Sequence, residues 1–205
     1  MPSNRRRRSG KPLKRTPGKR PELRTIVVFC EGSNSEPEYV RALKQLPHIA
    51  KNTALELRVH PERSVPLPLV RMAVQQKRDP EVDECWCIFD VEWPENHPNL
   101  LEAKALAESN DVNLAISNPC FELWLILHFK DHHAFINTTP AERLSCTLDN
   151  RSGKSIDAAM YMPLRKEAAR RAERLDKRHD RDGTTFPHDN PSSGVYKFLK
   201  SVEGE

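Results

Sequence analysis

The sequence predicts an α/β fold in which a four-stranded, mostly parallel sheet is flanked by helices. Short apolar runs with the composition of strands alternate along the chain with segments of helical length and periodicity. Ser, Asn or Pro residues stand where most of the helical segments begin, as is typical of helix N-termini. An alternating order of strands and helices is typical of a parallel sheet with right-handed crossovers.

Four segments have the composition of strands. Residues 25–30 (TIVVFC) and 84–89 (ECWCIF) are almost continuously apolar, which is typical of central strands covered on both faces. Residues 55–60 (LELRVH) alternate between apolar and polar side chains, which indicates a half-exposed or edge strand. Residues 112–117 (VNLAIS) form the fourth predicted strand.

The helices are predicted from their starting signals. Ser35 and Glu38 have the S-x-x-E spacing of a capping box, and Asn118 is expected to cap a helix with proline at its first position. A short last helix is expected after Ser192 or Ser193. Apart from this last helix, the predicted helices span residues 35–46, 66–77, 99–110, 118–129 and 164–178.

Composition divides the chain into three parts. Residues 1–24 are rich in Arg, Lys, Pro, Ser and Gly and are expected to be a disordered basic arm. Residues 25–135 hold the alternating strands and helices and are expected to form the α/β core. Residues 136–205 are expected to be a C-terminal helical extension packed on that core.

Charge is distributed unevenly along the chain. The arm carries ten basic residues and one acid, for a net charge of +9, and subtracting this from the +4 of the whole chain leaves −5 for the rest. A basic arm on an acidic body favours a polyanionic partner, so we expect nucleic acid to contact the arm, although a solubilising tail explains it equally well. The arginines in question are Arg5, Arg6, Arg7 and Arg8.

Several function classes are disfavoured. No apolar run is long enough to cross a bilayer and no apolar segment follows the basic N-terminus, so we expect a cytoplasmic protein without membrane contact. The cysteines are expected to be reduced core residues, and Cys85 and Cys87 with His97 are not expected to bind zinc. The G-K-S of residues 153–155 lacks the preceding glycine and strand of a phosphate-binding P-loop.

Acidic residues follow two of the predicted strands. Glu31 comes directly after the first strand, and Asp90 and Glu92 follow the third as D-x-E. If the strand order is 2-1-3-4, these acids meet at the switch point of the sheet, where ligands of α/β proteins bind. Clustered carboxylates favour Mg²⁺ or Mn²⁺, which activate water and neutralise charge on phosphoryl groups. The alternative is that they are solvated loop acids.

Other residues are expected near the same edge of the sheet. Glu122, in the first turn of a predicted helix, is a candidate fourth metal ligand, although it also complements the helix N-terminus. Gly32 is expected to allow a positive φ or a close approach of the backbone. Ser117 and Asn118 are candidates to line the site. Glu36 is assigned to the helix dipole and ranked below Glu31.

Four stretches of the chain resemble a known family. They are VVFCEGSNSEPEY (27–39), WCIFDVE (86–92), AISNPCFELWLILHF (115–129) and PSSGVYKFL (191–199). They resemble the RloB family, whose members are encoded near bacterial restriction–modification and phage-defence genes. The resemblance covers about residues 25–200.

The resemblance implies a Toprim-like, Rossmann-like sheet, as in topoisomerases, primases and OLD-type nucleases. In Toprim proteins an acid after the first strand and a D-x-D after a later strand bind magnesium. Glu31 matches the first acid and Asp90 with Glu92 match the second, although the family usually has Asp where this chain has Glu92. Glutamate is longer but still provides hard oxygen ligands.

Together these observations predict a metal-dependent phosphodiesterase or nuclease acting on DNA or RNA in bacterial anti-phage defence. Glu31 is expected to be a general base or metal ligand, and Asp90 and Glu92 to hold the metal. A co-encoded defence-system protein is a further expected partner. The alternatives are a non-catalytic nucleic-acid-binding or adaptor protein that retains the fold, and a hydrolase of small phosphoesters.

Overall fold

The structure is a computed structural model that describes residues 23–59 and 65–204 of the 205-residue chain. Within these residues the strands form one five-stranded sheet in the order β2-β1-β3-β4-β5. The parallel strands are β1 (Arg24–Cys30), β2 (Thr53–Val59), β3 (Glu84–Asp90) and β4 (Asn113–Asn118); β5 (Ser192–Ser193) runs antiparallel to β4.

The predicted α/β class is confirmed, and the first four strands have the order 2-1-3-4 on which the meeting of the acids depends, but the sheet is mixed and has a fifth strand. β5 is not among the predicted strands, because Ser192–Ser193 is too short to show any periodicity and serine is a common residue at helix caps. Predictions for the arginines of the basic arm lie outside the described residues.

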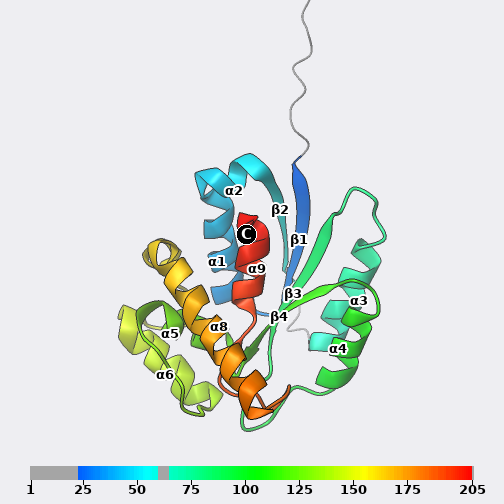
Figure 1. The fold of residues 1–205 in the computed structure, drawn as a ribbon. Helices are drawn as coiled ribbons and strands as arrows, with labels where there is room; N and C mark the ends of the chain where they lie inside the picture. The colour runs from blue at the N-terminus through cyan, green and yellow to red at the C-terminus, as the bar shows by residue number, and fades with distance from the viewer. Residues whose placement is uncertain (1–22, 60–64, 205) are drawn as a thin grey trace, which may run out of the picture.

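Helices cover both faces of the sheet, as Figure 1 shows. Ile26 and Val28 of β1 face the core formed with α1, α5, α8 and α9, whereas Val27 and Phe29 face the core formed with α3 and α4. This alternation confirms that β1 is a central strand buried on both sides. The helices are α1 (Ser35–Gln45), α3 (Pro66–Gln76), α4 (Leu100–Glu108), α5 (Phe121–Phe129), α8 (Arg165–Asp182) and α9 (Val195–Glu203).

Several helical segments were not predicted from the sequence. They are α2 (Pro47–Asn52), α6 (Thr138–Asp149), α7 (Ala158–Tyr161) and the 3₁₀ turn Met162–Leu164. The C-terminal part of the chain is not only helical, because it supplies β5 to the sheet, and α9 lies against the sheet in Figure 1.

Two predicted helix caps are wrong. Helix α1 follows Asn34 without a side-chain cap, and the Glu38 carboxylate instead accepts hydrogen bonds from the Ser155 hydroxyl at 2.8 Å and the Ile156 amide at 2.6 Å. Helix α5 follows Cys120, so Asn118 is the last residue of β4 and not a cap. The side chains of Glu38 and Asn118 thus bond to residues distant in sequence and not to the backbone of the adjacent helix.

Among the described residues, no helix is long and apolar enough to cross a membrane. The cysteines of the chain are all free, and Cys30, Cys85 and Cys87 are buried as predicted.

Candidate functional site

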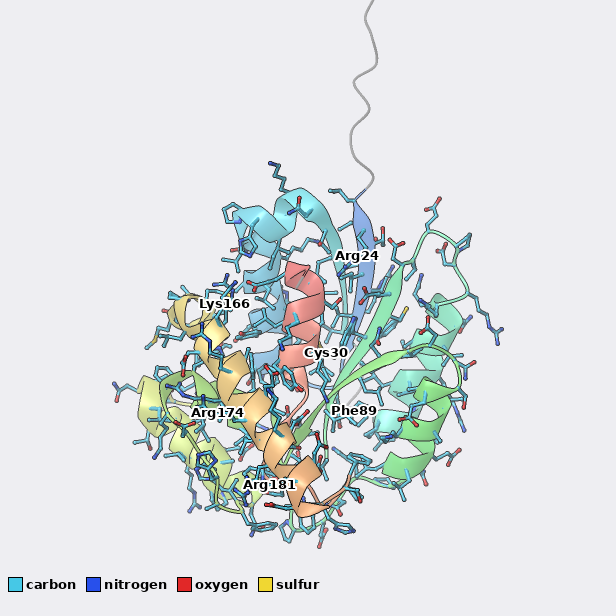
Figure 2. The ribbon with its side chains drawn as sticks, viewed as in Figure 1. Arg24, Cys30, Phe89, Lys166, Arg174 and Arg181 are labelled. Carbon is cyan, nitrogen blue, oxygen red and sulfur yellow. The ribbon has the colours of Figure 1, made fainter. Side chains whose placement is uncertain are left out.

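The carboxyl ends of β1 and β3 bring Glu31 and Asp90 together. The strands are parallel neighbours, with Cys30 opposite Ile88, and the Glu31 amide donates to the Ile88 carbonyl at 3.1 Å. The Asp90 amide in turn donates to Oε2 of Glu31 at 3.2 Å. Strand β1 has β2 on one side and β3 on the other, so the strand order switches direction between β1 and β3. Ligands of open α/β sheets bind at such a switch point. Figure 2 labels Cys30 and Phe89, the residues that precede the two acids.

The Glu31 carboxylate is held at both oxygens. While Oε2 accepts from Asp90, Oε1 lies 2.9 Å from Nε2 of His97. The His97 amide donates to the Val91 carbonyl at 2.9 Å, which fixes the loop that carries the ring. The hydrogen bond with Glu31 raises the pKa of His97 in spite of partial burial. Glu31 therefore has a fixed orientation at the end of β1.

Asp90 has an unsatisfied oxygen. Its Oδ1 is buried and has no hydrogen-bond partner among the described residues. Burial raises the pKa of Asp90 well above its usual range, and the charges of Glu36, Glu31, Glu122 and Glu92 raise it further. Buried polar atoms are nearly always paired, so an unpaired carboxylate oxygen among other acids is a feature that requires explanation.

Glu36, in the first turn of α1, is a buried member of the same cluster. Burial raises its pKa to about 7; hydrogen bonds from its own amide and that of Gly32 oppose the increase, and the charges of Glu122 and Glu31 add to it. The carboxylate lies directly over Gly32, where an added Cβ would come within 2.3 Å of Oε2 of Glu36. Any larger residue at position 32 would therefore displace the Glu36 carboxylate from this position.

Glu122 enters the cluster from the first turn of α5. It is 6% exposed, and the Ser35 hydroxyl lies 3.4 Å from its Oε1. Its charge raises the pKa values of Glu36 and Asp90, which places it in electrostatic range of both groups. The acid predicted as a fourth ligand therefore lies at the same edge of the sheet as Glu31 and Asp90.

Glu92 does not follow from the extended-chain argument. Strand β3 ends at Asp90, and Glu92 has a left-handed φ of 66°, so the alternation of a strand does not apply to the two acids. The Glu92 amide donates to the Pro119 carbonyl at 2.8 Å and its carbonyl accepts from the Asn96 side chain at 2.5 Å, which holds this unfavourable conformation. Its carboxylate still contributes to the raised pKa of Asp90, as the smallest of the four charge effects.

The comparisons with known proteins give one match. The family described as RloB-like protein matches residues 26–202. The chain belongs to the RloB-like family. Neither the curated proteins nor the solved structures contain a significant match. The matched range of this RloB-like chain runs from β1 into α9 and includes every acid of the cluster.

Ser117 and Asn118 of the RloB-like chain, which were predicted to line the site, make their side-chain hydrogen bonds to residues outside the acidic cluster. The Ser117 hydroxyl lies 3.3 Å from that of Ser193, which joins β4 to β5. The Asn118 side chain accepts from the Trp93 indole at 2.8 Å and donates to the Pro187 carbonyl at 2.9 Å and to Asp189 at 2.8 Å. These contacts hold the end of β4 against the C-terminal segment and leave no Asn118 side-chain group facing the acids.

The donor chemistry of the cluster suits a hard divalent cation, because carboxylate oxygens are the preferred ligands of Mg²⁺ and Mn²⁺. The unpaired Oδ1 of Asp90 is the atom that most needs such a partner. Across residues 23–59 and 65–204, no group of three or more His, Cys, Asp or Glu side chains is gathered as a formed metal site. In the RloB-like chain the acids are thus coupled by charge but not arranged as a closed set of ligands.

Besides the predicted acids, the structure brings Glu36 and His97 to this edge of the sheet. Glu36 was assigned to the helix dipole, but the spacing G-x-x-x-E directly after Glu31 is a signal that glycine makes room for a carboxylate. His97 was considered only with cysteines, and its position in the loop after D-x-E is the signal that connects it with Glu31.

Proposed function

We propose that this RloB-like protein is a divalent-metal-dependent phosphodiesterase that acts on nucleic acid and serves in bacterial anti-phage defence. The observation that carries the proposal is the buried, unpaired Oδ1 of Asp90 within a cluster of mutually repelling carboxylates. Carboxylates in such a cluster either bind protons or share a cation, and hard oxygen ligands favour Mg²⁺ or Mn²⁺. The defence role is supported by family membership and the gene context that the family implies.

Each acid has a distinct part in the proposal. Glu31 and Asp90, from neighbouring strand ends, would hold the cation, with Glu122 and Glu92 completing or orienting its ligands. A divalent cation would supply charge neutralisation for the phosphodiester and activation of water. His97 fixes Glu31, and the pKa of about 7 for Glu36 suits a group that exchanges protons near neutral pH.

A cleavage assay tests the proposal. Supercoiled plasmid and single-stranded RNA are incubated with Mg²⁺ or Mn²⁺ and the wild-type protein, Asp90→Asn, or the control Glu95→Gln. Glu95 is an exposed acid of the same loop region, outside the cluster. The proposal predicts cleavage by the wild type and the control and at least a ~100-fold loss in Asp90→Asn. Metal-dependent cleavage that is equal in all three proteins contradicts it.

A non-catalytic nucleic-acid-binding protein is the second candidate. The Glu31 carboxylate favours this candidate. Both of its oxygens already accept hydrogen bonds, from His97 and from the Asp90 amide, and this competes with the binding of a metal. Binding of nucleic acid that is equal for the wild type and Asp90→Asn, with no cleavage by either protein, would support this second function. Turnover of small phosphoesters alone would indicate a small-molecule hydrolase.

A further inference from the structure

The segment that follows α6, residues 150–157, docks on the first turn of α1. The Ser35 hydroxyl donates to the Lys154 carbonyl at 2.8 Å, and the Glu38 carboxylate accepts from the Ser155 hydroxyl and the Ile156 amide. Ser35 also contacts Glu122, so the segment lies against the elements that carry the acidic cluster. These bonds fix the backbone of the segment beside the candidate site, although the segment is distant in sequence from Ser35 and Glu38.

The segment is also held within itself. Gly153 has a φ of 92°, a conformation that L-residues rarely adopt, and its carbonyl accepts from Nε of Arg151 at 3.2 Å. Arg151 forms a buried ion pair with Asp149 at 2.6 Å. The turn that presents Lys154 is therefore fixed on both sides of the lysine, by Arg151 before it and by the bonds to Glu38 after it.

Lys154 places a positive charge beside the acids. Its side chain is 63% exposed and pairs with Glu142 at 3.1 Å. Burial alone would lower the pKa of Lys154, but the bond to Glu142 and the charges of Glu142, Glu122 and Glu92 raise it overall. The lysine thus lies in electrostatic range of Glu122 and Glu92, while its side chain as a whole is largely exposed.

We propose that Lys154 binds a backbone phosphate of the nucleic acid and positions it over the Glu31–Asp90 site. This inference rests on the proposed function and adds a substrate-binding residue to it. A polyanion approaching a carboxylate cluster is repelled unless a cation from the protein compensates, and a lysine on a fixed turn provides that charge. Its exposed pair with Glu142 is weak enough to exchange for phosphate.

The role differs from that of a P-loop, although the residues read G-K-S. No strand precedes the segment, and the carbonyl of Lys154 and the hydroxyl of Ser155 are committed to α1. The exposed side chain of Lys154 is the group that would contact a phosphate.

The test compares Lys154→Ala with Lys177→Ala. Lys177 on α8 is a matched control, because it pairs with Glu173 at 3.0 Å and its side chain is 71% exposed. Binding of a fluorescein-labelled oligonucleotide is measured by anisotropy in Ca²⁺ over a range of salt concentrations, and binding of Mn²⁺ by electron paramagnetic resonance.

Loss of one phosphate contact predicts about tenfold weaker oligonucleotide binding for Lys154→Ala and a salt slope reduced by about 0.7–0.9. Lys154→Arg should restore most of the affinity, Lys177→Ala should change it less than about twofold, and all three variants should retain saturable Mn²⁺ binding. Equal oligonucleotide affinities for Lys154→Ala and Lys177→Ala, with Mn²⁺ binding intact, overturn this inference alone. Mn²⁺ binding that is absent from the wild type overturns the proposed function itself.

Discussion

Replacing Glu36 by glutamine should stabilise the protein at alkaline pH. The substitution keeps the shape of the side chain and removes its charge from a buried cluster that contains Glu31, Asp90 and Glu122. Burial raises the pKa of Glu36 from 4.5 to about 7, so the folded state holds a proton that the unfolded state has already released. Stability of the wild type therefore falls as pH rises from about 4.5 to about 7, and the loss is complete above that range.

The size of the effect follows from the pKa shift. A difference of about 2.5 pKa units corresponds to about 3 kcal/mol at pH 8 and to less than about 1 kcal/mol at pH 5. Glu36→Gln removes this penalty, so the free energy of unfolding of the variant relative to the wild type should rise by about 2 kcal/mol between pH 5 and pH 8.

Urea denaturation followed by tryptophan fluorescence measures this difference. The buffers contain EDTA, so that bound cations do not contribute, and Glu95→Gln is the control because Glu95 is an exposed acid outside the cluster. The control should follow the wild type at both pH values. If the Glu36→Gln and wild-type curves stay parallel from pH 5 to pH 8, the reasoning on the buried acid cluster is refuted.

Three other substitutions test the contacts around the site. His97→Gln removes the ion pair with Glu31 and should lower Mn²⁺ affinity about tenfold in calorimetric titration; an unchanged affinity would show that His97 does not position Glu31. Gly32→Ala places a Cβ against the buried Glu36 carboxylate and should lower stability by about 1–3 kcal/mol in thermal unfolding; an unchanged melting temperature would show that the carboxylate moves aside without cost. Asn118→Leu leaves the Trp93 indole unpaired and should cost about 1–3 kcal/mol of stability in urea; a neutral result would remove Asn118 from the account of the fold.

The central part of the fold could be predicted because its signals are local. β1 and β3 are almost continuously apolar, and the structure buries them between two layers of helices. β5 and the true partners of Ser35, Glu38 and Asn118 could not be predicted, because they depend on contacts between residues distant in sequence. The S-x-x-E spacing of Ser35 and Glu38 does not distinguish a capping box from a glutamate that bonds to a distant segment.

The candidate site could be predicted in part for the same reason. Acids directly after parallel strands reach one edge of the sheet by topology alone, which is why Glu31 and Asp90 meet. Glu36 and Lys154 depend on tertiary packing, which buries the one and carries the other to the site from a distant turn. Glu92 was predicted from strand alternation, which does not extend past the end of β3.

The central claim is that Glu31 and Asp90 hold a divalent cation between β1 and β3. Calorimetric titration of Mg²⁺ and Mn²⁺ into the wild type, Asp90→Asn and Glu95→Gln tests it most directly. The account predicts saturable binding by the wild type and the control, and affinity at least about tenfold weaker in Asp90→Asn. Cation binding that is the same with and without the Asp90 carboxylate would contradict it.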